Sequence, residues 1–237
     1  MRSVYVLTLR QLFGRWRLLI MTVLASMPVL FAMLTVRSIR APSVQEFETV
    51  VFSAMLAGSI SPLIALAIAT AAFANEIEDR TLANLTLSPL PRWQIVVPKL
   101  LGAVTVAGPF IAISAIVTSH VAFLGDAAAT FAVAGAALVG VVLYSSAFLW
   151  LGLVTTHAIG FGLLYIVLWE GFFSGFVSGV RLLSIRHYSI ALMHGLDERR
   201  FAAANHLSLG VAITTSVIVL AGFLLLSIRR LRRMDVP

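Results

Sequence analysis

The sequence contains no cysteine, which excludes disulfide bonds, thiolate catalysis and cysteine-ligated metal sites. Charge is also scarce, because charged residues make up 11% of the chain and Lys99 is its single lysine. The motif G-x-x-x-x-G-K-[ST] is missing, so no lysine is placed to bind nucleotide phosphates. If ATP powers this protein, another polypeptide has to bind the nucleotide.

Long apolar stretches take up most of the 237 residues. The chain is 60% hydrophobic and its mean hydropathy is +1.01, which does not fit a soluble globular domain. A membrane span needs about 20 apolar residues. The sequence therefore predicts an all-α integral membrane protein, with one transmembrane domain over residues 1–237. Six spans are expected, at residues 18–36, 50–74, 95–123, 127–155, 158–180 and 207–228.

Residues 1–17 are predicted to form an amphipathic helix that lies in the membrane interface. Arg10 and Arg17 fall on a different side from the apolar positions. The apolar face would consist of Tyr5, Leu9, Leu12, Phe13 and Trp16. A soluble extension of the first span is the alternative. Four arginines in this segment do not fit a cleavable signal peptide.

Six spans place both termini on the same side of the membrane, and the distribution of basic residues selects the side. With cytoplasmic termini, eleven of the seventeen lysines and arginines are cytoplasmic, and residues 181–206 form an outer segment. The net charge of +7 could also suggest nucleic-acid binding, but the arginines lie at the ends of apolar stretches rather than on one soluble face. We expect a multi-pass protein of a prokaryotic cytoplasmic membrane.

A dense polar insert, residues 75–94, separates the second and third spans and contains three of the ten acidic residues. Thr81 can cap a short helix that begins at Leu82 and ends before Pro89. The insert is either a docking surface or an ordinary solvated loop, and the residues alone do not decide between them. The candidate contact residues are Glu76, Glu78, Asp79, Arg80, Thr81, Leu82, Leu85, Pro89 and Arg92.

This insert resembles the signature of ABC type-2 transport permeases. The residues that match the pattern are Glu76, Glu78, Thr81, Leu82, Pro89, Leu90, Arg92, Ile95, Lys99 and Gly102, whereas Arg80 stands where glycine is common. The resemblance implies that the insert is a cytoplasmic coupling helix, which docks onto a separate ATP-binding-cassette ATPase. It also implies export, pairing with a second copy or a related permease, no cofactor on this chain, and ATP with Mg on the partner.

Glu170 is an ionisable residue inside the expected fifth span, where such a group is costly unless it faces protein or water. Gly171, Gly175 and Gly179 follow it in a spacing that allows close helix packing. The family resemblance implies a broken or re-entrant fifth span that Glu170 caps or anchors. From the residues alone, Glu170 is either a structural carboxylate or part of the transport path.

Two other functions remain open from the sequence. An ATP-independent carrier or channel would use Glu170 as an ion or proton site. An intramembrane enzyme is less well supported, because the five histidines lack the spacing of a zinc motif and no serine lies in a nucleophile motif. We therefore predict a permease subunit of an ABC exporter, which is not itself an enzyme. The sequence does not indicate its substrate.

Overall fold

The computed structural model describes residues 2–37, 43–78, 91–173, 183–201 and 207–234. It is 89% helical and contains no strand in the described part of the chain, which confirms the all-α prediction. Five described helices are long and apolar enough to cross a membrane: Arg15–Arg37, Val44–Ala74, Trp93–Ala122, Ala127–Val154 and Leu209–Arg233. A shorter apolar helix covers Ala158–Phe172.

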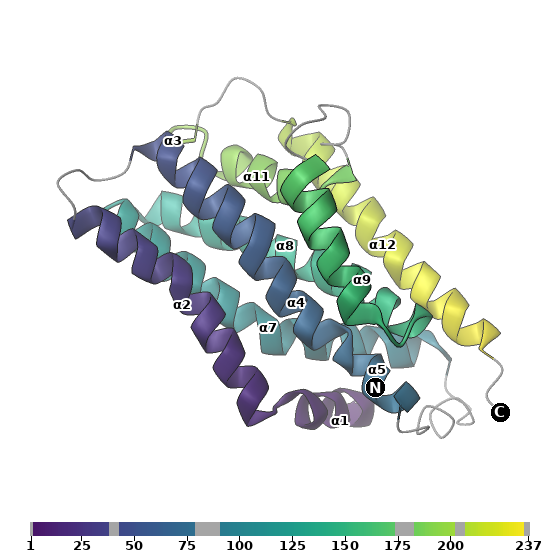
Figure 1. Cartoon of the computed structure of the whole chain (residues 1–237). Coiled ribbons are helices and arrows are strands. Elements are labelled where there is room, and N and C mark those ends of the chain that lie inside the picture. Colours follow the sequence, from purple (N-terminus) through teal and green to yellow (C-terminus); the bar gives the residue numbers. More distant parts are fainter. Residues whose placement is uncertain (1, 38–42, 79–90, 174–182, 202–206, 235–237) are drawn as a thin grey trace.

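The N-terminal helix α1 (Arg2–Leu12) lies across one end of the bundle, at an angle to α2 (Arg15–Arg37) (Figure 1). Its buried residues are Val4, Thr8 and Leu12, which recur every four positions and pack toward α7. Of the apolar face expected from the sequence, Leu12 is buried against protein, whereas Phe13 and Trp16, which follow this helix, are exposed.

The next stretch of helix changes its hydrogen-bonding pattern twice. It consists of α3 (Val44–Glu46), the π-helix η1 (Phe47–Ile60), α4 (Ser61–Ala69) and α5 (Ala71–Glu78). Ser43 and Glu46 form a capping box at its start. Pro62 lies just after the change from π-helical to α-helical bonding, at a position where its missing N–H is tolerated.

Helix α8 (Ala127–Val154) is the centre of the bundle and packs against α4, α7, α11 and α12. It follows α7 (Trp93–Ala122) after a tight turn, in which Gly125 has a positive φ of 85°. Asp126 caps α8, because its side chain accepts hydrogen bonds from the backbone N–H groups of Ala128 and Ala129.

The C-terminal part comprises α9 (Ala158–Leu164), the π-helix η2 (Tyr165–Phe173), α11 (Ile185–Leu196) and α12 (Leu209–Arg233). The expected fifth span, residues 158–180, is described only as far as Phe173, so its predicted break lies outside the described residues. Helix α12 continues beyond the expected end at residue 228 and carries the C-terminal arginines within its last turns.

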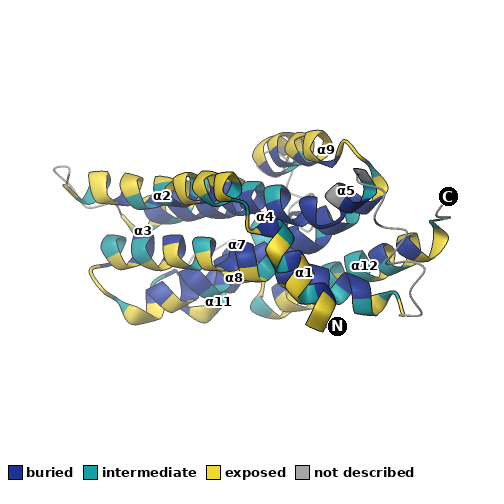
Figure 2. Cartoon of the chain, turned by 90° about the horizontal axis from the view of Figure 1, so that it is seen from below, coloured by how far each residue is buried: buried dark blue, intermediate teal, exposed yellow. Residues whose placement is uncertain are grey.

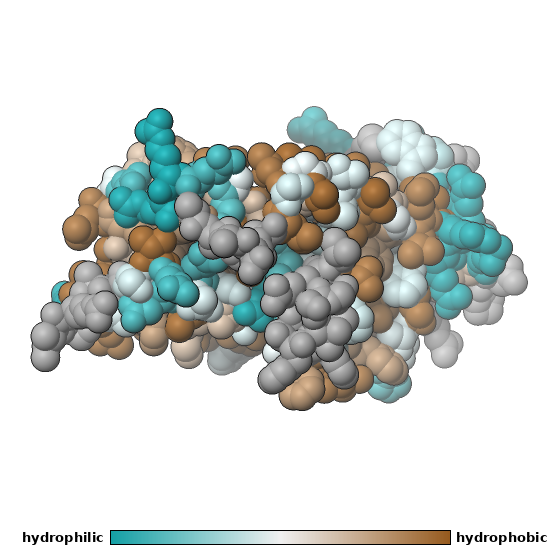
Figure 3. All heavy atoms as spheres, turned by 90° about the horizontal axis from the view of Figure 1, so that it is seen from above, coloured by the Kyte–Doolittle hydropathy of each residue, from teal (hydrophilic) through white to brown (hydrophobic). Residues whose placement is uncertain are grey.

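Helix α1, α5 and the end of α12 lie at one end of the bundle, which we call the terminal end (Figures 1 and 2). The α7–α8 turn and α3 lie at the other end, the far end. Burial is greatest in the middle, and the outer sides of α2 and α9 are exposed (Figure 2). Large apolar side chains such as Leu34, Val167 and Ile218 are exposed there and on α12, and hydrophobic atoms are widespread over the face in Figure 3. Such faces suit contact with lipid.

Gly152 of α8 marks a close approach of two backbones in the core. A Cβ at this position would lie 2.7 Å from the carbonyl oxygen of Thr70. We expect Gly152→Ala to lower the stability of the protein by about 1–3 kcal/mol, as overpacked cores do. Gly160→Ala is the matched control, because nothing lies within 4 Å of its added Cβ. Thermal unfolding of both variants in detergent tests this, and equal unfolding temperatures would contradict it.

Candidate functional site

A buried ion pair joins α5 to α7 at the terminal end. Glu76 Oε1 lies 2.6 Å from Lys99 Nζ, and the side chains are 4% and 0% exposed. The same ammonium donates a hydrogen bond to the carbonyl oxygen of Ala72 and lies 4.5 Å from the ring centroid of Phe73. Lys99 is therefore held by three groups of α5, although it belongs to α7.

This arrangement follows from helical spacing. Ala72 and Glu76 are four residues apart, so they lie on the same side of α5 and present a carbonyl and a carboxylate to one ammonium group. A buried charge is tolerated only when it is paired and hydrogen-bonded. The sequence suggested that Glu76 contacts a partner protein, but the structure turns its carboxylate toward Lys99 and leaves the residue only 3% exposed.

The other residues expected in the coupling segment are only partly described. Glu78 ends α5 and its side chain is not described. Arg92 is half-buried and directly precedes α7, where its carbonyl oxygen accepts from the N–H groups of Ile95 and Val96. The remaining predicted residues lie outside the described part of the chain: Asp79, Arg80, Thr81, Leu82, Leu85 and Pro89.

A second buried polar cluster surrounds Glu170, which is 0% exposed. Its Oε1 accepts from the hydroxyl of Tyr165 at 3.0 Å and from the N–H of Ile185 at 3.1 Å. Its Oε2 accepts from the hydroxyl of Ser184 at 2.6 Å. Because Ile185 begins α11, the carboxylate lies at the positive end of that helix, which favours an anion. Glu170 thus links η2 to the start of α11.

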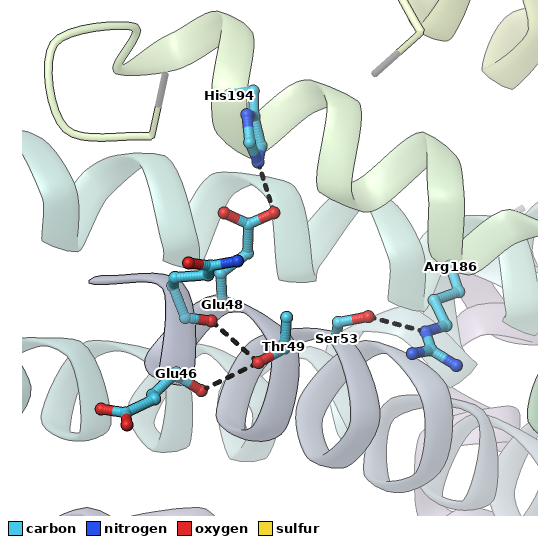
Figure 4. Close-up of polar contacts among 7 residues, drawn as sticks. Glu46, Glu48, Thr49, Ser53, Arg186 and His194 are labelled. Atoms are coloured by element: carbon cyan, nitrogen blue, oxygen red, sulfur yellow. Dashed lines mark hydrogen bonds and ion pairs between the residues drawn. The ribbon is translucent and has the colours of Figure 1, made fainter. Parts of the chain in front are cut away.

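Arg186 extends this cluster to η1. Its Nε donates to Ser53 Oγ at 2.8 Å (Figure 4), and its Nη1 donates to the carbonyl oxygen of Glu170 at 3.1 Å. Tyr144 of α8 also reaches η1, because its hydroxyl donates to the carbonyl oxygen of Ala57 at 3.2 Å. Polar contacts therefore connect both π-helices with α8 and α11, and such helices are frequently found at functional sites.

A hydrogen bond between two largely buried side chains connects the other end of α11 to η1. His194 Nε2 lies 2.8 Å from Glu48 Oε1, and Figure 4 shows the imidazole pointing from α11 toward this carboxylate. Together with Arg186, it holds α11 on η1 at two points. No local pattern in the sequence could have paired these two residues, because they are 146 positions apart.

Of the three glycines that follow Glu170, only Gly171 belongs to the described residues, and it has no close neighbour. Gly171 is exposed, and a Cβ added to it would approach only the carbonyl oxygen of Ile166, at 3.6 Å. Gly175 and Gly179 lie outside the described residues. Close helix packing occurs instead at Gly102, where an added Cβ would meet Thr8 at 2.8 Å. Within the described residues, no group of three or more His, Asp or Glu could hold a metal ion.

The long apolar helices and their few buried charges define a multi-pass membrane protein. A family model described as "ABC-2 family transporter protein" matches residues 9–168, which is more than half of the chain. The chain belongs to this family, as the polar insert predicted, and is therefore a membrane component of an ABC transporter that is not itself catalytic. No curated protein matched the sequence.

Proposed function

We propose that this chain is the permease subunit of an ABC exporter and that the polar insert, residues 75–94, receives a separate ATPase subunit. The observation that carries this proposal is the Glu76–Lys99 pair, because it joins the two helices that flank the proposed docking segment. The segment resembles the coupling-helix signature of this family in its sequence, and this resemblance supports the proposal. ATP and Mg would be bound by the partner, and this chain would bind no cofactor.

The buried pair connects the docking segment mechanically to the membrane helices. A push on the polar insert reaches α5 and α7 together, because Lys99 of α7 is bonded to Glu76 and to the Ala72 carbonyl of α5. Helix α7 in turn packs against α1, α2 and α8. ATP can shift the transporter between conformations only through different binding to the two states. We propose that the two states differ in how the ATPase contacts the polar insert, and that the α5–α7 connection passes this difference to the membrane helices.

The proposed topology puts the terminal end in the cytoplasm. Exposed Arg2 and Arg10 lie on α1 at this end, and the exposed arginines of the last turn of α12 lie at the same end (Figure 1). Basic residues concentrate on the cytoplasmic side of membrane proteins. In this topology, residues 158–180 form the fifth of six spans. Two copies, or two related permeases, form the transport path.

The contacts of Glu170 favour a structural role over the ion or proton site of an ATP-independent carrier. Its two carboxylate oxygens accept from Tyr165, Ser184 and the Ile185 N–H, so they already serve as a cap for α11. A transported ion would have to displace these donors. This supports the ATP-coupled permease as the better proposal.

Docking is tested with paired leucine substitutions in the segment. Leu82→Ala combined with Leu85→Ala should reduce copurification of the native ATPase subunit roughly tenfold, because apolar anchors dominate protein interfaces. Arg80→Glu should reduce it as well. Arg199→Glu is the control, since Arg199 is exposed on the opposite segment after α11. Undiminished copurification and ATPase activity in the leucine variant would refute docking at this segment.

A further inference from the structure

A cavity of about 410 Å³ lies between α8, the α9–η2 helix, α11 and α12. This volume is typical of sites for small organic molecules, which occupy roughly 300–1,000 Å³. Phe161 and Leu183 line it and are more than half exposed, so the cavity opens at the outer surface of the molecule beside α9. The neighbouring exposed side chains of α9 include Leu163 and Leu164, so the opening lies among side chains suited to lipid.

Aromatic side chains dominate the walls of this cavity. Seven of its twelve described lining residues are aromatic, whereas aromatic residues make up 10% of the chain. The rings of Trp150 and Phe223 are 5.8 Å apart, and those of Phe148 and Tyr165 are 6.1 Å apart. Such walls favour a planar ring, which can make stacked or edge-to-face contacts with several of them at once.

A groove elsewhere on the molecule shows that exposure to lipid alone does not account for the aromatic composition of the cavity. It has a volume of about 500 Å³ and lies between α7, α8, α11 and α12. Its ten described lining residues include no aromatic side chain, and most are leucine, valine or isoleucine. Val217 of α12 faces this aliphatic groove, whereas Val219 faces the aromatic cavity. A flexible acyl chain is suited to the aliphatic groove, and the aromatic cavity is suited to a more rigid ligand.

The aromatic walls are held in place by hydrogen bonds. The hydroxyl of Tyr165 donates to Glu170, and Nε1 of Trp169 donates to the carbonyl oxygen of Leu183 at 3.3 Å. These two rings are therefore oriented before any ligand arrives, which lowers the entropic cost of binding. Because these polar groups are used within the protein, the cavity offers mainly apolar contacts, and the matching ligand is neutral.

We propose that this cavity binds a neutral, lipophilic compound with a planar aromatic ring system, which enters laterally from the bilayer. The ring lies among the side chains of α8, η2 and α12. The proposal requires only that the chain resides in a membrane, so it does not depend on coupling to an ATPase.

Benzophenone is a suitable probe, because it is neutral and aromatic and forms a covalent bond to nearby C–H groups when illuminated. The full chain is reconstituted in phospholipid nanodiscs, labelled with benzophenone, and the adducts are mapped by peptide mass spectrometry. Adducts are expected on α8, η2 and α12 at the cavity, and excess N-phenyl-1-naphthylamine should suppress them. Phe223→Ala should reduce labelling roughly tenfold, since it removes a ring and apolar contact area.

Leu220→Ala is the matched control, because Leu220 lies on the same helix but lines the aliphatic groove. It should leave benzophenone labelling unchanged. A fatty acid that carries a diazirine should label the aliphatic groove and the exposed helix faces in preference to the aromatic cavity. Equal labelling of the cavity by the fatty acid would identify it as an acyl-chain site. Benzophenone adducts that are spread over the surface, or that persist in Phe223→Ala, would also overturn the proposal.

Discussion

Lys99→Met is expected to destabilise this protein by roughly 3–5 kcal/mol, because a buried carboxylate that has lost its cation is poorly solvated. The variant removes the ammonium group that contacts Glu76, Ala72 and Phe73 at once. Methionine retains a similar length, so little of the effect comes from an empty space. Thermal unfolding in detergent, followed by circular dichroism, measures this loss.

The double variant Glu76→Gln with Lys99→Met separates stability from coupling. Replacing both members of a buried pair is often close to neutral, so this protein should unfold near the wild-type temperature. If the pair transmits movement from the docking segment, the folded double variant should still copurify with the ATPase and should lose transport. Normal transport would refute the coupling role. A single variant as stable as the double variant would refute the energetic argument.

Glu170→Ala is expected to cost roughly 3 kcal/mol or more, because buried donors that lose their acceptor are left without compensation. The donors are the hydroxyls of Tyr165 and Ser184 and the N–H of Ile185. The substitution also removes the negative group at the start of α11. The unfolding temperature in detergent should fall, together with the yield of folded protein.

Glu170→Gln is the informative partner of this variant. Its amide oxygen still accepts hydrogen bonds, so the loss of stability should be smaller than in Glu170→Ala. If Glu170 serves only to hold η2 and α11 together, transport should survive in Glu170→Gln. Loss of transport in a fully stable Glu170→Gln protein would instead support the ion or proton site.

The sequence predicted the features that depend on local pattern. Long apolar stretches located the helices. Local residue types also account for the turn before α8, where Gly125 adopts a positive φ and Asp126 caps the helix. The polar insert identified the family, because its matching residues are close together in the sequence.

Features that depend on tertiary pairing could not be predicted. Glu76 belongs to the polar insert and Lys99 to the expected third span, but they face each other inside the protein because α5 and α7 lie side by side. His194 and Glu48 meet only because α11 packs on η1. The contact of α1 with α7 could not be predicted either, because a helical period alone does not show which side of the helix meets another helix.

The two polar contacts between η1 and α11 have a consequence for the synthesis of the chain. Ser53 and Arg186 are separated by 133 positions, and Glu48 and His194 by 146. Protein synthesis adds about 5–20 residues per second, so η1 is made on the order of 10 s before α11. The far end of the molecule is therefore completed late. The half of the protein that is made first has to reside in the membrane before α11 is available to pack on η1.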